Sequence, residues 1–191
     1  MSAAARAEPV GRFGMIVFLA SETMLFGALV IALFNLRAAH RADFVAMSRQ
    51  MSLPLGTLNT VVLLSSSALV AFAVEAARGG ATSTASRALA AAAMLGLGFL
   101  AIKASEYAIE AREGLMPFAA TSLAPAQRLF MLAYLLATGL HALHVTVGIA
   151  ALAWAARAVR KGPAPVEDIG LYWHLVDVVW VFLFPVLYLS R

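Results

Sequence analysis

The chain has 191 residues, of which 62% are hydrophobic and 13% are charged. Soluble domains carry about a quarter charged residues, so this composition excludes a globular surface in water and predicts a membrane protein. The net charge of +4 comes mostly from residues that flank apolar runs, which is typical of membrane anchoring and argues against nucleic-acid binding. Because the chain contains no cysteine, disulfides and thiolate chemistry are also excluded.

Five apolar runs follow one another along the chain, each long enough to cross a bilayer. A hydrocarbon core about 30 Å thick needs about 20 apolar residues at a rise of about 1.5 Å each. We therefore predict an all-α membrane protein whose five transmembrane helices form one bundle and a single polytopic domain over 1–191. The helices are expected at about 13–36, 56–77, 87–107, 128–156 and 171–189.

The first predicted helix carries Glu22 near its middle, inside an otherwise apolar segment. A charged residue at the centre of a transmembrane helix costs about 2.5–3.5 kcal/mol on insertion scales, so such a residue usually faces other protein. Gly14 and Gly27 in the same helix predict a close approach by a neighbouring helix. The connection after it, 37–53, has three arginines and a histidine and is expected to lie at the membrane interface.

The third predicted helix has a charge pair, Lys103 and Glu106, near its far end. Residues three apart lie on the same face of a helix. Two interpretations remain open for this outer charge pair: a helix-end pair at the level of the lipid headgroups, or a part of a binding surface. The next connection, 110–127, is too polar to insert.

The last two predicted helices also carry paired ionisable residues. In the fourth helix the segment GLHALHV places His141 and His144 one turn apart. In the fifth helix His174 and Asp177 lie three residues apart and share a face. Such residues within membrane spans mark a structural or functional site that is shielded from lipid.

Alternation of the five helices brings five ionisable residues to a similar depth in one half of the membrane. We expect the first, fourth and fifth helices to pack together with these groups hydrogen-bonded inside. The residues of this intramembrane polar cluster are Glu22, His141, His144, His174 and Asp177. A structural polar core and a proton relay through histidine are both compatible with it. The spacing does not match the Glu-x-x-His pairs of di-iron bundles, so neither a metal site nor a catalytic residue is predicted.

Five segments in this order resemble subunit III of the heme-copper terminal oxidases. They read SETMLFGALV, LNTVVLLSSSALVAFA, KASEY, GLHALHVTVGI and WHLVDVVWVFLFPVLYL. The resemblance implies a non-catalytic subunit that binds the catalytic subunit I and subunit II in a respiratory complex that reduces oxygen and pumps protons. Heme and copper would lie in the partner subunits, with none in this chain.

The resemblance also implies roles for particular residues. Glu22 matches the carbodiimide-reactive carboxylate of the family, and bound phospholipid and support of proton uptake by subunit I are expected. His141, His144, His174 and Asp177 match family motifs without a known metal.

The chain lacks the first two helices of seven-helix members and is similar to the five-helix form. Similar chains also accompany nitric oxide reductases, which is the main alternative. An intramembrane metal-binding or proton-transport protein is the other alternative.

The distribution of lysine and arginine predicts the orientation. Connections on the side of the N-terminus carry seven such residues and those on the other side six, Arg191 included. The excess favours a cytoplasmic N-terminus and a periplasmic C-terminus in a bacterial inner membrane.

Overall fold

The structure, a computed structural model, describes residues 3–118 and 123–190, with side chains from residue 12 onward. Arg191, which was counted for the orientation, lies outside the described residues. The described part of the chain contains six helices and no strand: α1 (Ala3–Ala39), α2 (Arg41–Gln50), α3 (Leu53–Arg78), α4 (Thr82–Arg112), α5 (Pro125–Ala158) and α6 (Val166–Tyr188). All but α2 are long and apolar enough to cross a membrane, which confirms the predicted fold class.

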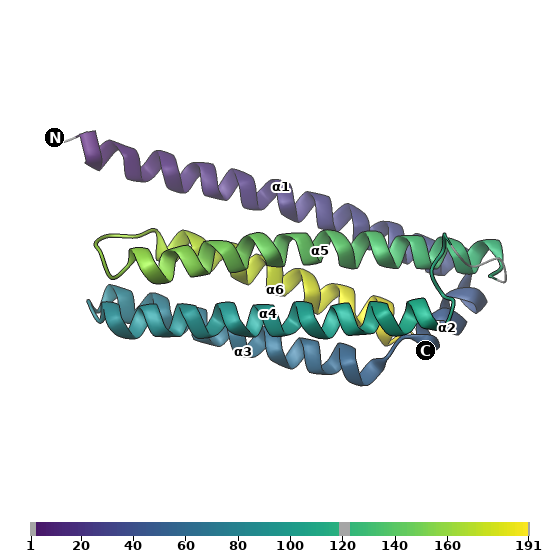
Figure 1. Ribbon diagram of the computed structural model, residues 1–191. Coiled ribbons are helices and arrows are strands. Elements are labelled where there is room, and N and C mark those ends of the chain that lie inside the picture. The colour runs from purple at the N-terminus through teal and green to yellow at the C-terminus, as the bar shows by residue number, and fades with distance from the viewer. Residues whose placement is uncertain (1–2, 119–122, 191) are drawn as a thin grey trace.

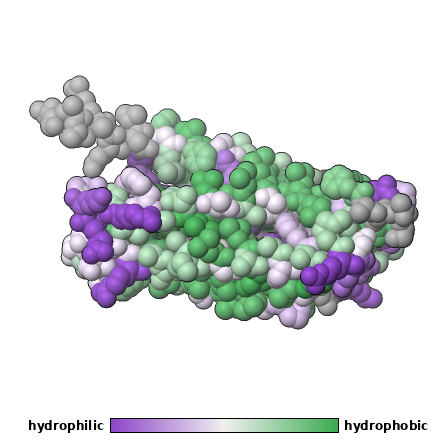
Figure 2. All heavy atoms as spheres, in the orientation of Figure 1, coloured by the Kyte–Doolittle hydropathy of each residue, from purple (hydrophilic) through white to green (hydrophobic). Residues whose placement is uncertain are grey.

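The five long helices run back and forth in one bundle (Figure 1). The start of α1 and the α3–α4 and α5–α6 links lie at one end, which we call the N-terminal end. Helix α2, the α4–α5 connection and the end of α6 lie at the other, C-terminal end. Figure 2 shows hydrophobic surface over the middle of the bundle and hydrophilic surface at both ends. This banding is what a bilayer-spanning bundle requires.

Helix α2 lies within the predicted interfacial connection 37–53, which contains no apolar run. Phe44, Met47 and Ser48 of α2 are nevertheless buried. The hydroxyl of Ser48 donates a hydrogen bond of 2.8 Å to the carbonyl of Leu187 near the end of α6. The connection therefore folds back onto the bundle and covers its C-terminal end.

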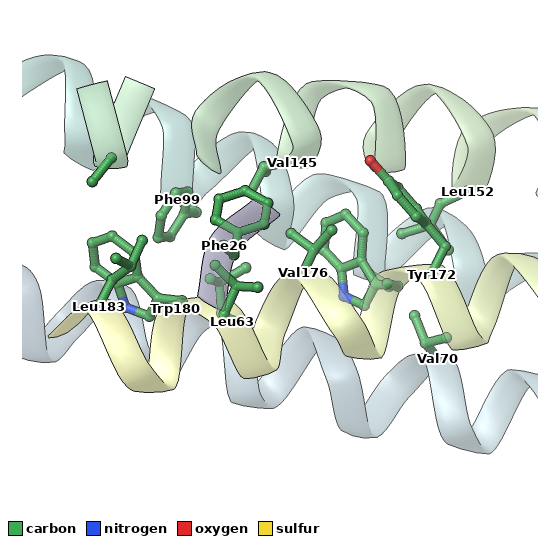
Figure 3. Close-up of a cluster of buried hydrophobic side chains, with 14 of the residues drawn as sticks. Phe26, Leu63, Val70, Phe99, Val145, Leu152, Tyr172, Val176, Trp180 and Leu183 are labelled. Atoms are coloured by element: carbon green, nitrogen blue, oxygen red, sulfur yellow. The ribbon is translucent and has the colours of Figure 1, made fainter. Parts of the chain in front are cut away.

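Helix α6 lies at the centre of the bundle, whereas α1 lies at its margin. In an 18-residue apolar stretch of α6, 50% of the residues are buried inside the chain, against 11% in the corresponding stretch of α1. Figure 3 shows Val176 and Trp180 of α6 among side chains from other helices, including Leu63 of α3, Phe99 of α4 and Val145 of α5. Side chains of the last predicted span thus lie at the centre of the core.

Two glycines allow α4, α5 and α6 to approach closely. A Cβ atom on Gly96 of α4 or on Gly148 of α5 would lie 2.8 or 2.7 Å from the indole of Trp173 in α6. By contrast, Gly14 and Gly27 of α1 have no such neighbour within 4 Å among the described atoms. No described helix of this chain therefore approaches closely at these two glycines. The close packing occurs around Trp173.

Candidate functional site

Glu22 of α1 and His144 of α5 form an ion pair or hydrogen bond across the bundle. Their Oε2 and Nε2 atoms are 2.9 Å apart, and each side chain is 15% exposed. The other ring nitrogen of His144, Nδ1, lies 2.8 Å from the carbonyl oxygen of Leu140. A carbonyl oxygen only accepts, so Nδ1 carries a proton and Nε2 of a neutral ring would be an acceptor. The contact with Glu22 therefore needs a further proton, held by the carboxyl or the imidazole.

Aromatic side chains surround this pair and join it to α6. The ring of Phe26 meets the imidazole of His144 edge-on, at 5.0 Å between centroids. The hydroxyl of Tyr172 in α6 donates a 3.1 Å hydrogen bond to the backbone carbonyl of His144. The first, fourth and fifth long helices, α1, α5 and α6, thus meet around the pair. The low-polarity surroundings strengthen its hydrogen bond relative to water.

His174 and Asp177 lie on another side of α6, facing α3. The hydroxyl of Ser67 is 2.6 Å from Nδ1 of His174. Asp177 is buried and interacts with both His174 and Ser67, and its Oδ1 atom has no hydrogen-bond partner among the described residues. Ser67, from the second predicted span, belongs to this group although it was not among the candidate site residues.

His141 lies apart from both pairs, fully buried between aromatic rings. Its ring stacks on Trp180 at 5.3 Å and meets Phe99 edge-on at 5.5 Å. Neither ring nitrogen has a hydrogen-bond partner within the described part of the chain. His141 is held by packing.

The five residues of the predicted intramembrane polar cluster thus occupy three places. Glu22 bonds to His144, His174 and Asp177 face Ser67, and His141 lies between Phe99 and Trp180. Over the ranges 12–118 and 123–190, no three His, Asp or Glu side chains gather closely enough to hold a metal ion.

Lys103 is the centre of a second polar group, near the C-terminal end of the bundle. Its ammonium donates hydrogen bonds of 2.8 Å to Glu106, 2.7 Å to the hydroxyl of Tyr134 and 2.6 Å to the hydroxyl of Tyr188. Tyr188 in turn donates to Oε2 of Glu106 at 2.9 Å, and Tyr134 donates to Oε1 of Glu110 at 2.6 Å. We call these five residues the Lys103 cluster.

The Lys103 cluster is enclosed by the chain itself. Lys103 and Glu106 are only 2% and 1% exposed. The ammonium also lies within about 6 Å of four aromatic rings, which adds cation–π attraction; the rings are those of Tyr107, Tyr134, Trp180 and Tyr188. A binding surface would require an exposed pair, which the burial of Lys103 and Glu106 contradicts, whereas their level relative to the lipid headgroups stays a prediction. The pair ties α4 to α5 and α6.

Three members of the Lys103 cluster were not selected from the sequence. Glu110 was assigned to the polar connection. In the structure α4 continues to Arg112, and Glu110 is a buried residue of this helix. Its position one turn after Glu106 was the available signal, because residues four apart share a helix face. Tyr134 and Tyr188 gave no comparable signal, since tyrosine is common in apolar spans and its partner depends on the fold.

Comparison of the sequence with known proteins identifies the family of the chain. The family model for cytochrome c oxidase subunit III matches residues 7–190. Proteins named cytochrome c oxidase subunit 3 are similar: that of Triticum aestivum is 32% identical, over 93% of this chain and 67% of its own length. The Marchantia polymorpha protein is 34% identical, over 93% and 67%, and the Mus musculus protein 30% identical, over 93% and 68%. Since the match takes in all five membrane helices, the chain belongs to the cytochrome c oxidase subunit III family.

Proposed function

We propose that this chain is the non-catalytic subunit III of a respiratory heme-copper oxidase, bound to the catalytic subunit I and to subunit II. The observation that carries the proposal is the family match over residues 7–190, which contains every candidate span. In this complex the chain supports assembly, phospholipid binding and the uptake of protons by subunit I. The redox chemistry belongs to heme and copper in the partner subunits.

Purification from native membranes tests this proposal. A tagged chain, extracted in mild detergent, is expected to bring with it a large heme-binding subunit that mass spectrometry identifies and a reduced-minus-oxidised spectrum detects. The purified complex is expected to consume oxygen. A chain that purifies without any heme protein would contradict the proposal. Reduction of nitric oxide without oxygen consumption would assign the chain to a nitric oxide reductase instead.

Glu22 is the proposed carbodiimide-reactive carboxyl. Carbodiimides add to protonated carboxyl groups, and the bond between Glu22 and His144 holds a proton that the carboxyl can carry. The side chain is 15% exposed, so a small apolar reagent can reach it from the lipid. Mass spectrometry of the treated complex is expected to find the adduct on Glu22 and to lose it in Glu22→Gln. An adduct that persists in Glu22→Gln would reject this assignment.

A groove between α4 and α5 supports the lipid-binding part of the proposal. It has a volume of about 350 Å³, with apolar lining that includes Ala93 and Ile149, and Arg157 and Arg160 at one end. Nη1 of Arg157 donates a 2.9 Å hydrogen bond to the carbonyl of Ala153, which leaves its other N–H groups for a phosphate. An acyl chain would occupy the apolar length and the phosphate would meet the two arginines.

Lipid analysis of the purified complex tests the groove. The double variant Arg157→Gln/Arg160→Gln is expected to lose at least half of the phospholipid that wild type retains through detergent washing. Arg112→Gln is the matched control, because Arg112 ends α4 at the opposite end of the bundle. Equal phospholipid content in the double variant and wild type would contradict the site.

A further inference from the structure

The Lys103 cluster carries a charge imbalance inside the bundle. Lys103, Glu106 and Glu110 are 2%, 1% and 3% exposed, so neither water nor a partner chain reaches them easily. If all three were ionised, the cluster would hold one positive and two negative charges. Burying an uncompensated carboxylate is strongly unfavourable, and a buried group usually neutralises instead.

Hydrogen-bond geometry identifies Lys103 as the charged member. Its ammonium has three N–H groups, and each has an acceptor: Oε2 of Glu106 and the hydroxyl oxygens of Tyr134 and Tyr188. The two tyrosine hydroxyls then donate their own protons to the carboxyl groups of Glu106 and Glu110. A neutral lysine would leave one of these acceptors without a donor.

The two carboxyl groups differ in how well they are stabilised as anions. Oε2 of Glu106 accepts both from the ammonium of Lys103, at 2.8 Å, and from Tyr188, at 2.9 Å. Glu110 accepts only from the neutral hydroxyl of Tyr134 in the described part of the chain. Hydrogen bonds from charged donors stabilise a carboxylate most, which favours the anion at Glu106.

Among the described residues, the other charged groups that act on Glu110 do not correct the imbalance. The described charged groups that act on Glu110 are Lys103, Glu106 and Glu113, of which two are acidic. Oε1 of Glu106 and Oε2 of Glu110 have no hydrogen-bond partner among the described residues. Both atoms belong to side chains on the same face of α4, one turn apart.

We propose that Glu106 and Glu110 form a buried proton-binding site, in which one carboxyl group, that of Glu110, is protonated while Lys103 remains charged. The ligand is a proton, and the site is separate from the Glu22–His144 bond near α1. This inference does not rest on the proposed function, because every group that forms the site comes from this chain.

Infrared spectroscopy of the full chain, purified with its native partners, tests the site through the carbonyl stretch of protonated carboxyl groups. Glu110→Gln is expected to remove the intensity of one carboxyl group from the wild-type spectrum. Glu106→Gln is expected to remove the same intensity, because Glu110 then becomes the carboxylate that balances Lys103. Lys103→Gln is expected to add one carboxyl group, because both acids are then protonated. Unchanged intensity in both glutamate variants would overturn the proposal.

Two controls separate the site from other sources of charge. Glu113→Gln removes an exposed acid of the same helix region and is expected to leave the band unchanged. Arg191 lies outside the described residues, so Arg191→Gln is tested as well and is expected to leave the band unchanged. A gain of one carboxyl group in Arg191→Gln would show that its guanidinium balances the second carboxylate, and would overturn the proposal.

Stability measurements give a second readout on the same variants. Lys103→Gln is expected to lower the Tm of the purified protein at neutral pH, because two buried acids must then stay protonated. Lys103→Gln/Glu106→Gln is expected to recover part of the loss, because only one buried acid must stay protonated in the double variant. A double variant with a lower Tm than Lys103→Gln would contradict the charge balance described here.

Discussion

Glu22 and His144 depend on one another through a single bond between α1 and α5, at 2.9 Å. Nδ1 of His144 donates its proton to the carbonyl oxygen of Leu140. Nε2 of the neutral ring can therefore accept a hydrogen bond from an amide as well as from a protonated carboxyl group. The nature of the side chain at position 22 therefore decides whether this bond survives.

Glutamine and leucine at position 22 are expected to behave differently. Glu22→Gln keeps a donor for Nε2 and should leave Tm and assembly close to wild type. Glu22→Leu leaves that nitrogen without a partner at a cost of about 1–3 kcal/mol and should lower Tm. Thermal unfolding of the purified variants measures the difference. Glu75→Gln, at a side chain that is 78% exposed, is the control. Equal Tm values for the Gln and Leu variants would show that the bond contributes nothing.

Individual site residues were predictable only where a residue type was unusual for its surroundings in the sequence. Glu22, Lys103 and Asp177 stand out because charge is rare in apolar spans. Their partners could not be named, since Ser67 and Tyr188 are ordinary residues for a membrane helix and are brought close only by helix rotation. The position of a residue along a predicted helix gives its depth in the membrane. Its contacts also depend on how each helix is rotated about its axis, which the sequence does not show.

Helices α4, α5 and α6 are held together by shape as well as by hydrogen bonds. Trp173 occupies the space left by Gly96 and Gly148, so the three backbones come closer than larger side chains would permit. Small residues at such crossings are the usual means of close helix packing in membranes.

A methyl group at position 148 is expected to disturb this packing. In Gly148→Ala the new Cβ would lie 2.7 Å from the indole of Trp173, so the helices must shift, at about 1–3 kcal/mol. Gly139→Ala, in the same helix, is the matched control because no described atom outside the local backbone lies within 4 Å of its Cβ. Gly148→Ala should therefore lower Tm, while Gly139→Ala should not. The opposite order would contradict the packing.

The five long helices were predictable because length and hydropathy alone determine a membrane span. Their ends were not, and α4 extends from Thr82 to Arg112 although 87–107 was expected. Helix α2 was missed as a helix because its burial depends on Phe44 and Met47 meeting other elements, and ten residues with charges give no span signal. Tertiary contacts decide both outcomes.

At the scale of the whole molecule, the arrangement of the ends predicts which positions are accessible from each side of the membrane. The chain contains no cysteine, so single cysteines can be introduced without removing any. Ser83→Cys and Gly162→Cys lie near the N-terminal end of the bundle, and Glu113→Cys lies near the C-terminal end.

If the N-terminus is cytoplasmic and the membrane is a bacterial inner membrane, as the lysine and arginine distribution predicts, an impermeant maleimide added to intact spheroplasts should label Glu113→Cys only. After the membranes are opened, Ser83→Cys and Gly162→Cys should be labelled as well. Labelling of Ser83→Cys in intact spheroplasts, with Glu113→Cys protected, would reverse the orientation. Equal labelling of Ser83→Cys and Glu113→Cys from one side would contradict an odd number of crossings between them.

The central position of α6 has a consequence for biosynthesis. The ribosome makes α6 after the four other spans, although α1, α3 and α5 all pack against it. Helices α3 and α4 can pair as soon as both have left the translocon, but α1 must wait in the lipid for its main neighbour. Translation that stops before Val166 would therefore yield inserted helices that lack the central helix, with α1 left without its main neighbour, and quality-control proteases can remove them before they reach a partner.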